Sequence, residues 1–229
     1  MKGLCLILFM ALGLACASGG AAAQDRAAFL AGATIHCPGC DLRGANLDRR
    51  NLADADLTGA NLNLAVLTSA NLARAKMVQA MLFQAEANGA DFTKANLTAA
   101  LMGSARLTVA KLDGADLSFT DLWEARLTNA SLRNATLTDA NLHAATLLRA
   151  DMSGVIGDRT TLVRASMHGA KLAGAVLHGA DLFQADLVEA DLSGTDLGSS
   201  RLLAAKLFNA NQTGTNFQGA IMPDNSVHP

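Results

Sequence analysis

The residues with the clearest chemical potential form the stretch HCPGC, residues 36–40, in which two residues separate a pair of cysteines. A Cys-x-x-Cys pair can act as a redox dithiol, and together with His36 the two thiols could bind a metal ion. No βαβ pattern surrounds the pair, although a thioredoxin-like redox site would require one. His36, Cys37 and Cys40 also leave a Zn²⁺ site one ligand short of the usual four. Redox chemistry and metal binding are therefore the weaker interpretations of this pair.

Other catalytic arrangements have even less support. Ser, His and Asp are all present in number, but nothing in their spacing places one of each together. No glycine-rich phosphate-binding loop occurs either. We therefore predict that the protein is not an enzyme, and that it has no cofactor and no metal site. The net charge of −2 comes from acidic and basic residues mixed along the chain, which argues against a nucleic-acid-binding footprint.

The first 23 residues are typical of a signal peptide. Lys2 forms a short positive region, and residues 4–17 form an apolar run that is too short for a comfortable membrane span. Ala21 and Ala23 make an A-x-A site, which places cleavage before Gln24. We expect a periplasmic or secreted protein with no membrane span in the mature chain. A retained N-terminal anchor is the alternative interpretation.

A five-residue repeat occupies most of the remaining chain. From Cys40 onward, 37 pentads follow one another without an insertion or a deletion. The third residue of each pentad is Leu, Met or Phe everywhere except at Ala87, Gly157 and Gln212. The first residue is Ala in 29 of the 37 pentads, and the second favours Asp or Asn. This pattern needs a structure with a period of five.

Neither regular secondary structure satisfies that period. In a helix, five residues advance about 140° beyond a full turn, so the leucines would scatter around the axis. In a strand, successive leucines would point to opposite faces. Only a chain that turns a corner once per pentad can direct every third residue inward. Internal repeats of short fixed length are the signature of a solenoid.

The units ANLDR, ADLTG, ANLTA and ADLSG resemble the A-(D/N)-L-x-x unit of the pentapeptide-repeat family. The resemblance covers about 185 of the 229 residues. It implies an all-β fold, a right-handed quadrilateral β-helix with four pentads per coil and about nine coils, in which the first and third residues face inward. We expect an N-terminal cap over residues 24–39, the β-helix over residues 40–222 and a C-terminal tail over residues 223–229. In the cap, residues 25–32 predict a short helix whose Phe29 and Leu30 plug the first coil.

The resemblance also bears on the cysteine pair. A Cys-x-x-Cys before the first pentad is familiar in this family, so the resemblance favours a structural disulfide between Cys37 and Cys40. Two other features deviate from the pattern. Residues 154–165 match it worst, and there we expect a bulge or short loop in which Ile156 turns inward in place of Gly157. Arg50 stands where Ala is usual, in a first coil that we expect to be open to solvent.

One side of the predicted coil is unusually apolar. Residues 20 apart lie on the same side of successive coils, and one such set carries large apolar residues at its second and fourth pentad positions. These residues form the predicted apolar stripe: Met81, Phe83, Leu101, Trp123, Val163, Phe183 and Leu203. A contiguous exposed apolar surface usually marks an interface. The alternative is that these side chains fold down and only shield the edges of the coils.

These observations favour a non-catalytic protein-interaction or structural rod that binds itself or an unknown protein partner, and no nucleic acid. The family resemblance offers an alternative, because some pentapeptide-repeat proteins resemble B-form DNA and bind topoisomerases. That role needs a strongly acidic surface and a cytoplasmic address, which the mixed charge and the export signal oppose. A surface-binding face is a third hypothesis, based on the column Thr58, Thr98, Ser118 and Thr138, which Val78 interrupts.

Overall fold

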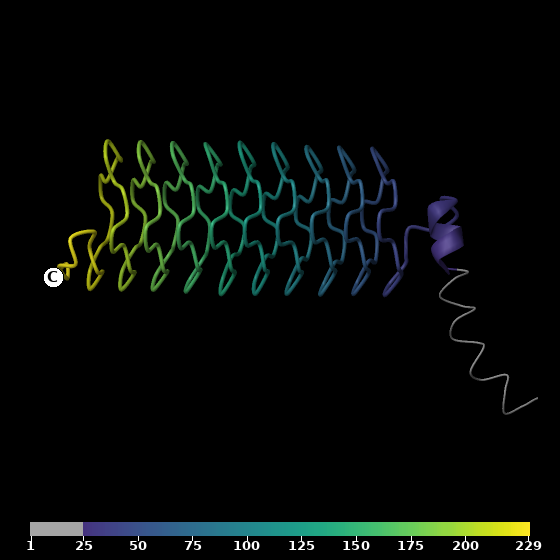
Figure 1. Cartoon of the computed structure of the whole chain (residues 1–229), viewed down its shortest axis with the longest axis horizontal. Helices are drawn as coiled ribbons and strands as arrows, with labels where there is room; N and C mark the ends of the chain where they lie inside the picture. Colours follow the sequence, from purple (N-terminus) through teal and green to yellow (C-terminus); the bar gives the residue numbers. More distant parts are fainter. Residues whose placement is uncertain (1–24) are drawn as a thin grey trace, which may run out of the picture.

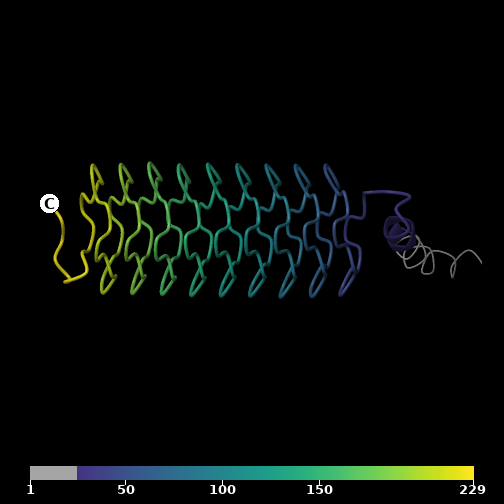
Figure 2. The same ribbon diagram turned by 90° about the horizontal axis from the view of Figure 1, so that it is seen from above.

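The computed structural model describes residues 25–229, and the predicted signal peptide lies outside the described residues. A helix spans residues 25–30, and the chain then winds into a rod of stacked coils with the C-terminus at the far end (Figure 1). The same outline is visible when the rod is turned by 90° (Figure 2). Within residues 25–229 the β-structure consists of single-residue bridges, one at the second position of each pentad, and no longer strand forms.

The bridges fix the register of the coils. They are parallel and join residues 20 apart, from Asp41↔Asn61 to Arg201↔Ile221. Four pentads therefore make one coil, as predicted. We number the sides by their first pentads: side 1 contains residues 40–44, side 2 residues 45–49, side 3 residues 50–54 and side 4 residues 55–59. Each side recurs every 20 residues.

The corner of each pentad explains why the repeat is five residues long. The fifth residue has a positive φ in every pentad from Gly44 to Gly219, including bulky residues such as Phe119 at +59°. Next to it, the amide of the following Ala donates to the carbonyl of the Leu three residues earlier, as in Ala45 N to Leu42 O at 3.0 Å. A four-residue turn with positive φ at its third residue has the type II form. Non-glycine residues are strained in this region, so the surrounding ladder must hold them there.

The preference for Asp and Asn at the second position has a local cause. The side-chain oxygen accepts a hydrogen bond from the backbone amide two residues later, as from Phe183 N to Asp181 Oδ1 at 3.0 Å. The same bond joins Thr93 N to Asp91 and Ser193 N to Asp191. Asp and Asn are short enough to mimic a backbone turn in this way. The second residue therefore stabilises the corner that follows it.

The interior is filled by the first and third residues of the pentads. Leucines such as Leu62 and the alanines beside them, such as Ala60, have no exposed surface. Where a hydroxyl replaces Ala, it reaches a backbone carbonyl: Thr120 Oγ1 donates to Leu97 O at 3.0 Å. Among the described residues, no buried side-chain polar atom lacks a hydrogen-bond partner. The core is narrow and mostly apolar, with small and medium side chains that pack closely.

The prediction of a bulge within residues 154–165 is wrong. The parallel bridges Thr136↔Ile156 and Ile156↔Val176 continue the ladder without interruption, and Ile156 points outward with 48% of its surface exposed. No other side chain has to turn inward at Gly157, because neighbouring side chains already fill the space that a central Leu would occupy. A Cβ built on Gly157 would lie 2.7 Å from Thr160 Oγ1 and 2.9 Å from Leu177 Cδ2. The coil tolerates a glycine at its centre because Thr160, at the next first position, compensates.

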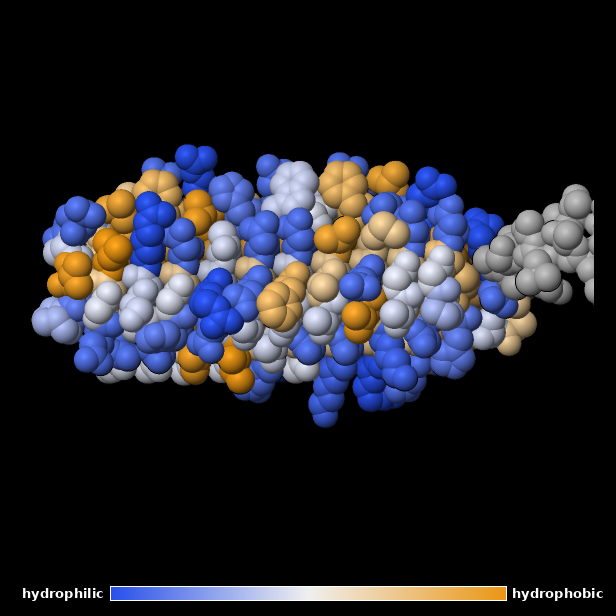
Figure 3. All heavy atoms as spheres, turned by 90° about the horizontal axis from the view of Figure 1, so that it is seen from below, coloured by the Kyte–Doolittle hydropathy of each residue, from blue (hydrophilic) through white to orange (hydrophobic). Residues whose placement is uncertain are grey.

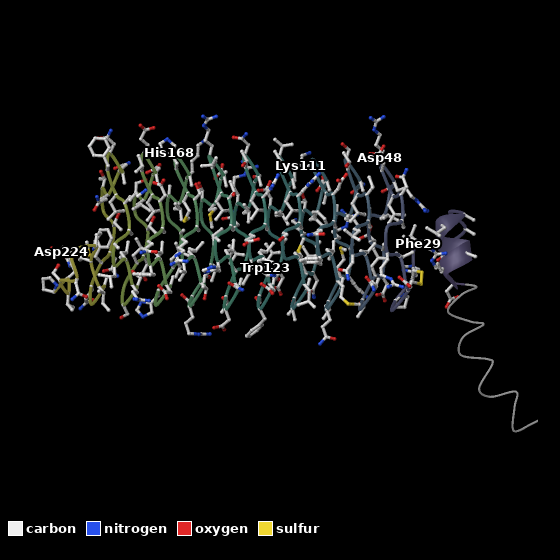
Figure 4. The ribbon with its side chains drawn as sticks, viewed as in Figure 1. Phe29, Asp48, Lys111, Trp123, His168 and Asp224 are labelled. Atoms are coloured by element: carbon white, nitrogen blue, oxygen red, sulfur yellow. A yellow bond between two sulfur atoms is a disulfide. The ribbon has the colours of Figure 1, made fainter. Side chains whose placement is uncertain are left out.

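The N-terminal end of the rod is covered by the helix. Phe29 is fully buried between the helix and the first coil (Figure 4), whereas Leu30 is 36% exposed and does not plug the coil. Arg50 is not open to solvent as expected, but partly buried against the helix. Its Nη2 donates to Phe29 O at 2.9 Å, and its guanidinium lies 5.1 Å from the Phe29 ring centroid. Arg50 therefore binds the helix to the coil.

The C-terminal tail reverses direction at the other end. Ile221 and Val227 form an antiparallel bridge, and His228 N donates to Ala220 O at 2.9 Å. The His228 ring lies 5.8 Å from the ring of Phe217. The tail therefore folds back over sides 4 and 1 of the last coil. No helix among the described residues is long and apolar enough to span a membrane.

Candidate interaction surface

The residues of the predicted stripe all lie on side 1. Phe83 is 38% exposed and Leu101 is 50% exposed. The other five are partly buried. Gly103, which is buried, and His143 separate the apolar residues along the column. The stripe is therefore a row of partly exposed side chains with gaps and not a continuous ridge.

Phe83 and Trp123 meet although they lie two coils apart. Their ring centroids are 6.1 Å apart and the rings are inclined by 28°. The residue between them on the column is Gly103, and a Cβ built there would lie 2.8 Å from Trp123 Cδ1. Any side chain at this position would therefore displace the indole. Gly103 allows Trp123 to lie over the backbone and reach Phe83, so the two rings form one aromatic unit. Trp123 lies near the middle of the rod (Figure 4).

Phe183 has a different environment in the C-terminal half of the stripe. The Arg201 guanidinium lies 4.4 Å from its ring centroid, at a distance typical of a cation–π contact. Arg201 also pairs with Asp181, at 3.3 Å between Nη1 and Oδ2. A positive charge therefore covers part of the Phe183 ring. The stripe therefore has two aromatic parts. One is the Phe83–Trp123 pair, and the other is Phe183, whose ring lies against the Arg201 guanidinium.

Several of the most exposed apolar side chains lie outside the predicted stripe. Phe208 on side 2 is 71% exposed, Phe119 on side 4 is 62% exposed and Leu64 is 57% exposed. Phe119 and Leu64 occupy fifth positions, at the corners, where the backbone turns outward. Listing large apolar residues at the fifth position as well as the fourth would have found them. On the face drawn in Figure 3, apolar side chains are interspersed with polar ones.

A polar groove of about 390 Å³ runs along the corner between sides 1 and 2. One wall consists of fifth-position residues and the other of second-position residues of the next side. The lining residues are Leu64, Gln84, Ser104, Glu124, Glu86, Arg106 and Arg126. Arg106 Nη1 and Glu86 Oε1 form an ion pair at 2.9 Å across one coil step. The repeat pattern alone did not reveal this groove, because its two walls belong to different columns that meet only at a corner.

Cys37 and Cys40 form a disulfide with Cα atoms 5.4 Å apart, and both residues are buried. His36 Nδ1 accepts a hydrogen bond from Asp56 N at 3.1 Å. The described residues contain no cluster of three or more His, Cys, Asp or Glu side chains placed to bind a metal ion. The pair therefore closes the segment that leads into the first coil, where Cys37 N donates to Asp56 O at 2.8 Å.

The charged side chains of the surface pair across coils. Arg74 donates two hydrogen bonds to Asp54, at 2.8 and 2.7 Å, and these hold the pKa of the Asp54 carboxyl below its usual range. Arg159 lowers the pKa of Asp139 in the same way. In both pairs the partners are 20 residues apart, so they connect neighbouring coils. This pairing neutralises charge locally and leaves no uniformly acidic face along these columns.

The geometry defines a repeat solenoid with a filled core. Eight copies of the family model for pentapeptide repeats match the chain between residues 36 and 222. The chain belongs to the pentapeptide-repeat family. Its fold is similar to that of HetL, a pentapeptide-repeat protein involved in the regulation of heterocyst differentiation in the cyanobacterium Nostoc. The two share 30% identity, with a TM-score of 0.67 over 87% of this chain and 96% of HetL.

A second solved structure shows the same fold at lower identity. QnrB1, a plasmid-mediated fluoroquinolone resistance protein, is 18% identical, with a TM-score of 0.58 over 69% of this chain and 84% of QnrB1. At this identity the likeness concerns the fold alone. No curated protein matches the chain in sequence.

Proposed function

We propose that this chain is a non-catalytic, exported interaction rod: a right-handed β-helix of about nine coils that binds a protein partner or a second copy through the apolar stripe of side 1. The observation that carries this proposal is the Phe83–Trp123 pair, held together over Gly103. Aromatic side chains dominate binding energy at interfaces when they lie near the centre of a contact surface. Phe83 and Trp123 bring two large rings into contact on one side of the rod, which suits that role.

Export rests on the predicted signal peptide over residues 1–23, with the disulfide as further support. Disulfides persist mainly in oxidising compartments such as the periplasm or the extracellular space. We expect the mature protein in a periplasmic or secreted fraction to begin at Gln24. N-terminal sequencing of the protein expressed with its full leader tests this. Recovery of the intact N-terminus in the cytoplasmic fraction would refute export.

The interface is tested with the double substitution Trp123→Ala/Phe183→Ala. We expect it to shift the association state measured by analytical ultracentrifugation and to reduce binding of an apolar surface dye. Phe119→Ala is the matched control, because it removes an exposed ring from side 4, outside the stripe. If association and dye binding are the same in the double variant and the wild type, the stripe is not an interface.

A further inference from the structure

The groove between sides 1 and 2 lies directly beside the aromatic pair. Three of its wall residues, Gln84, Ser104 and Glu124, immediately follow the column Phe83, Gly103 and Trp123. The groove therefore runs beside the rings over the three coils that contain them. Its volume of about 390 Å³ falls within the usual range for small-ligand sites. The polar character of its lining indicates which ligand chemistry would fit.

The groove presents hydrogen-bonding groups of every kind without a net charge. Two carboxylates, Glu86 and Glu124, balance two guanidinium groups, Arg106 and Arg126. Glu86 and Arg106 are already paired, whereas Glu124 and Arg126 have no ion-pair partner within residues 25–229. Within residues 25–229, the side chains of Gln84 and Ser104 also make no hydrogen bond to another protein group. A ligand that both donates and accepts many hydrogen bonds, but carries no strong charge, fits this set best.

A peptide backbone fits the groove poorly. The wall amides already donate within the ladder: Gln84 N to Gly103 O at 3.0 Å, Ser104 N to Trp123 O at 2.8 Å and Glu124 N to His143 O at 2.9 Å. The opposite wall is committed in the same way, as in Arg126 N to Ala105 O at 2.9 Å. A peptide that binds by adding a strand needs an exposed backbone edge, and neither wall offers one. Here side chains must make all the polar contacts.

We propose that the groove and the Phe83–Trp123 pair form a binding site for a short neutral oligosaccharide. Hydroxyl groups donate and accept, so they match the mixed side chains of the groove. Sugar rings also have an apolar C–H face, which can pack on an aromatic ring and remove its apolar surface from water. One sugar unit would lie in the groove, between Glu124 and Arg126, and a neighbouring unit on the rings. This saccharide site is separate from the proposed protein interface, because it includes the groove. A protein bound to the stripe would compete with the saccharide only for Phe83 and Trp123.

The chain contains a single Trp and no Tyr, so its indole fluorescence reports on Trp123 alone. We would titrate the folded protein with cellotetraose, chitotetraose and maltotetraose while recording the emission spectrum, and repeat each titration by calorimetry. We expect saturable binding of at least one tetrasaccharide. Arg126→Ala and Phe83→Ala should each weaken it about tenfold or more, and both variants retain the reporter. Circular dichroism checks that these surface variants keep the fold.

Two matched controls separate this site from the rest of the rod. Arg164→Ala removes a guanidinium from the same corner two coils beyond Glu124, and Phe183→Ala removes a ring from the other half of the stripe. Both should leave saccharide binding unchanged. The proposal is overturned if no tetrasaccharide produces heat or an emission change up to about 10 mM. It is also overturned if the groove variants bind as well as wild type, or if only a mixed-charge control peptide binds. Loss of self-association in Trp123→Ala/Phe183→Ala is a separate result that concerns the protein interface.

Discussion

The two ends of the rod close in different ways. At the N-terminal end, a helix covers the first coil, Arg50 of that coil donates to the helix, a disulfide closes the segment between them, and Phe29 is fully buried there. At the C-terminal end, the tail pairs with sides 4 and 1. No part of residues 25–229 covers sides 2 and 3 of the last coil, where Phe208 is 71% exposed and Gln212 is exposed at a central position. A solenoid needs caps at both ends, and this one concentrates its capping at the first.

The two ends of the rod differ because the backbone hydrogen bonds between coils are directional. In each pentad the third and fifth residues donate to the following coil, as Leu42 does to Asn61 O, while the second residue donates to the preceding coil. On sides 2 and 3 the first coil therefore leaves mainly carbonyl groups without a coil partner, and the last coil leaves mainly amides. The helix and Arg50 add positive and apolar groups at the carbonyl-rich end. The amide-rich end has no such cover among the described residues.

Removal of the buried Phe29 ring should have the largest effect on the free energy of unfolding. Phe29→Ala should lower the free energy of unfolding by about 3 kcal/mol, because it leaves a cavity between the helix and the first coil. Urea denaturation followed by far-UV circular dichroism measures this. The matched variant is Phe208→Ala at the other end, whose exposed ring should contribute less than about 0.5 kcal/mol. Equal effects at the two ends would contradict the asymmetry.

Loss of the disulfide should have the next largest effect. The double substitution Cys37→Ala/Cys40→Ala should lower the free energy of unfolding by about 2 kcal/mol, since the bond closes only a short loop. Dithiothreitol should produce a similar loss in the wild type and none in the double variant. Thermal unfolding with and without reductant gives both measurements. A wild-type protein that is insensitive to reductant would show that the bond adds little to the N-terminal cap.

Arg50 should matter less, because its contacts are few and partly exposed. Arg50→Met keeps the aliphatic stem but removes the hydrogen bonds to Phe29 O and Leu30 O and the contact with the Phe29 ring. We expect a loss of about 1 kcal/mol and faster exchange of the helix amides at residues 28–30. Arg49→Met is the control, since the neighbouring Arg49 side chain is 82% exposed and its substitution should be nearly neutral.

Most of the coil could be predicted from the sequence, because a period of five leaves one way to bury every third residue. Phe29 as a plug was predicted separately, from its place in the expected helix before the repeat. The error at Ile156 arose because the prediction treated each pentad as independent. In the structure Thr160 fills the space beside Gly157, and the ladder on both sides holds Ile156 outward. Arg50 was misplaced because its partners belong to the helix, whose position no repeat specifies.

The candidate site was less predictable than the fold. Column arithmetic placed Phe83 and Trp123 on one side, but their contact depends on rotamers that only Gly103 permits. The groove was missed because Glu124 and Arg126 belong to different columns. Comparing the fifth residue of each pentad with the second residue of the next pentad would have placed Glu124 and Arg126 together. Contacts between columns depend on side-chain direction, which a linear repeat does not encode.

The smallest predicted effect concerns the exchange of individual amide protons. It tests whether the hydrogen bonds between coils leave free amides at the C-terminal end. Leu207 and Gln212 lie on sides 2 and 3 of the last coil, and within residues 25–229 their amides have no acceptor. On the same sides of the first coil, Leu47 and Leu52 donate to Val66 O and Asn71 O, both at 2.7 Å. Hydrogen exchange followed by NMR should therefore be at least about a hundredfold faster at Leu207 and Gln212 than at Leu47 and Leu52. If both last-coil amides are protected and remain so on dilution, the C-terminal end is closed by the chain itself and the two ends are equivalent.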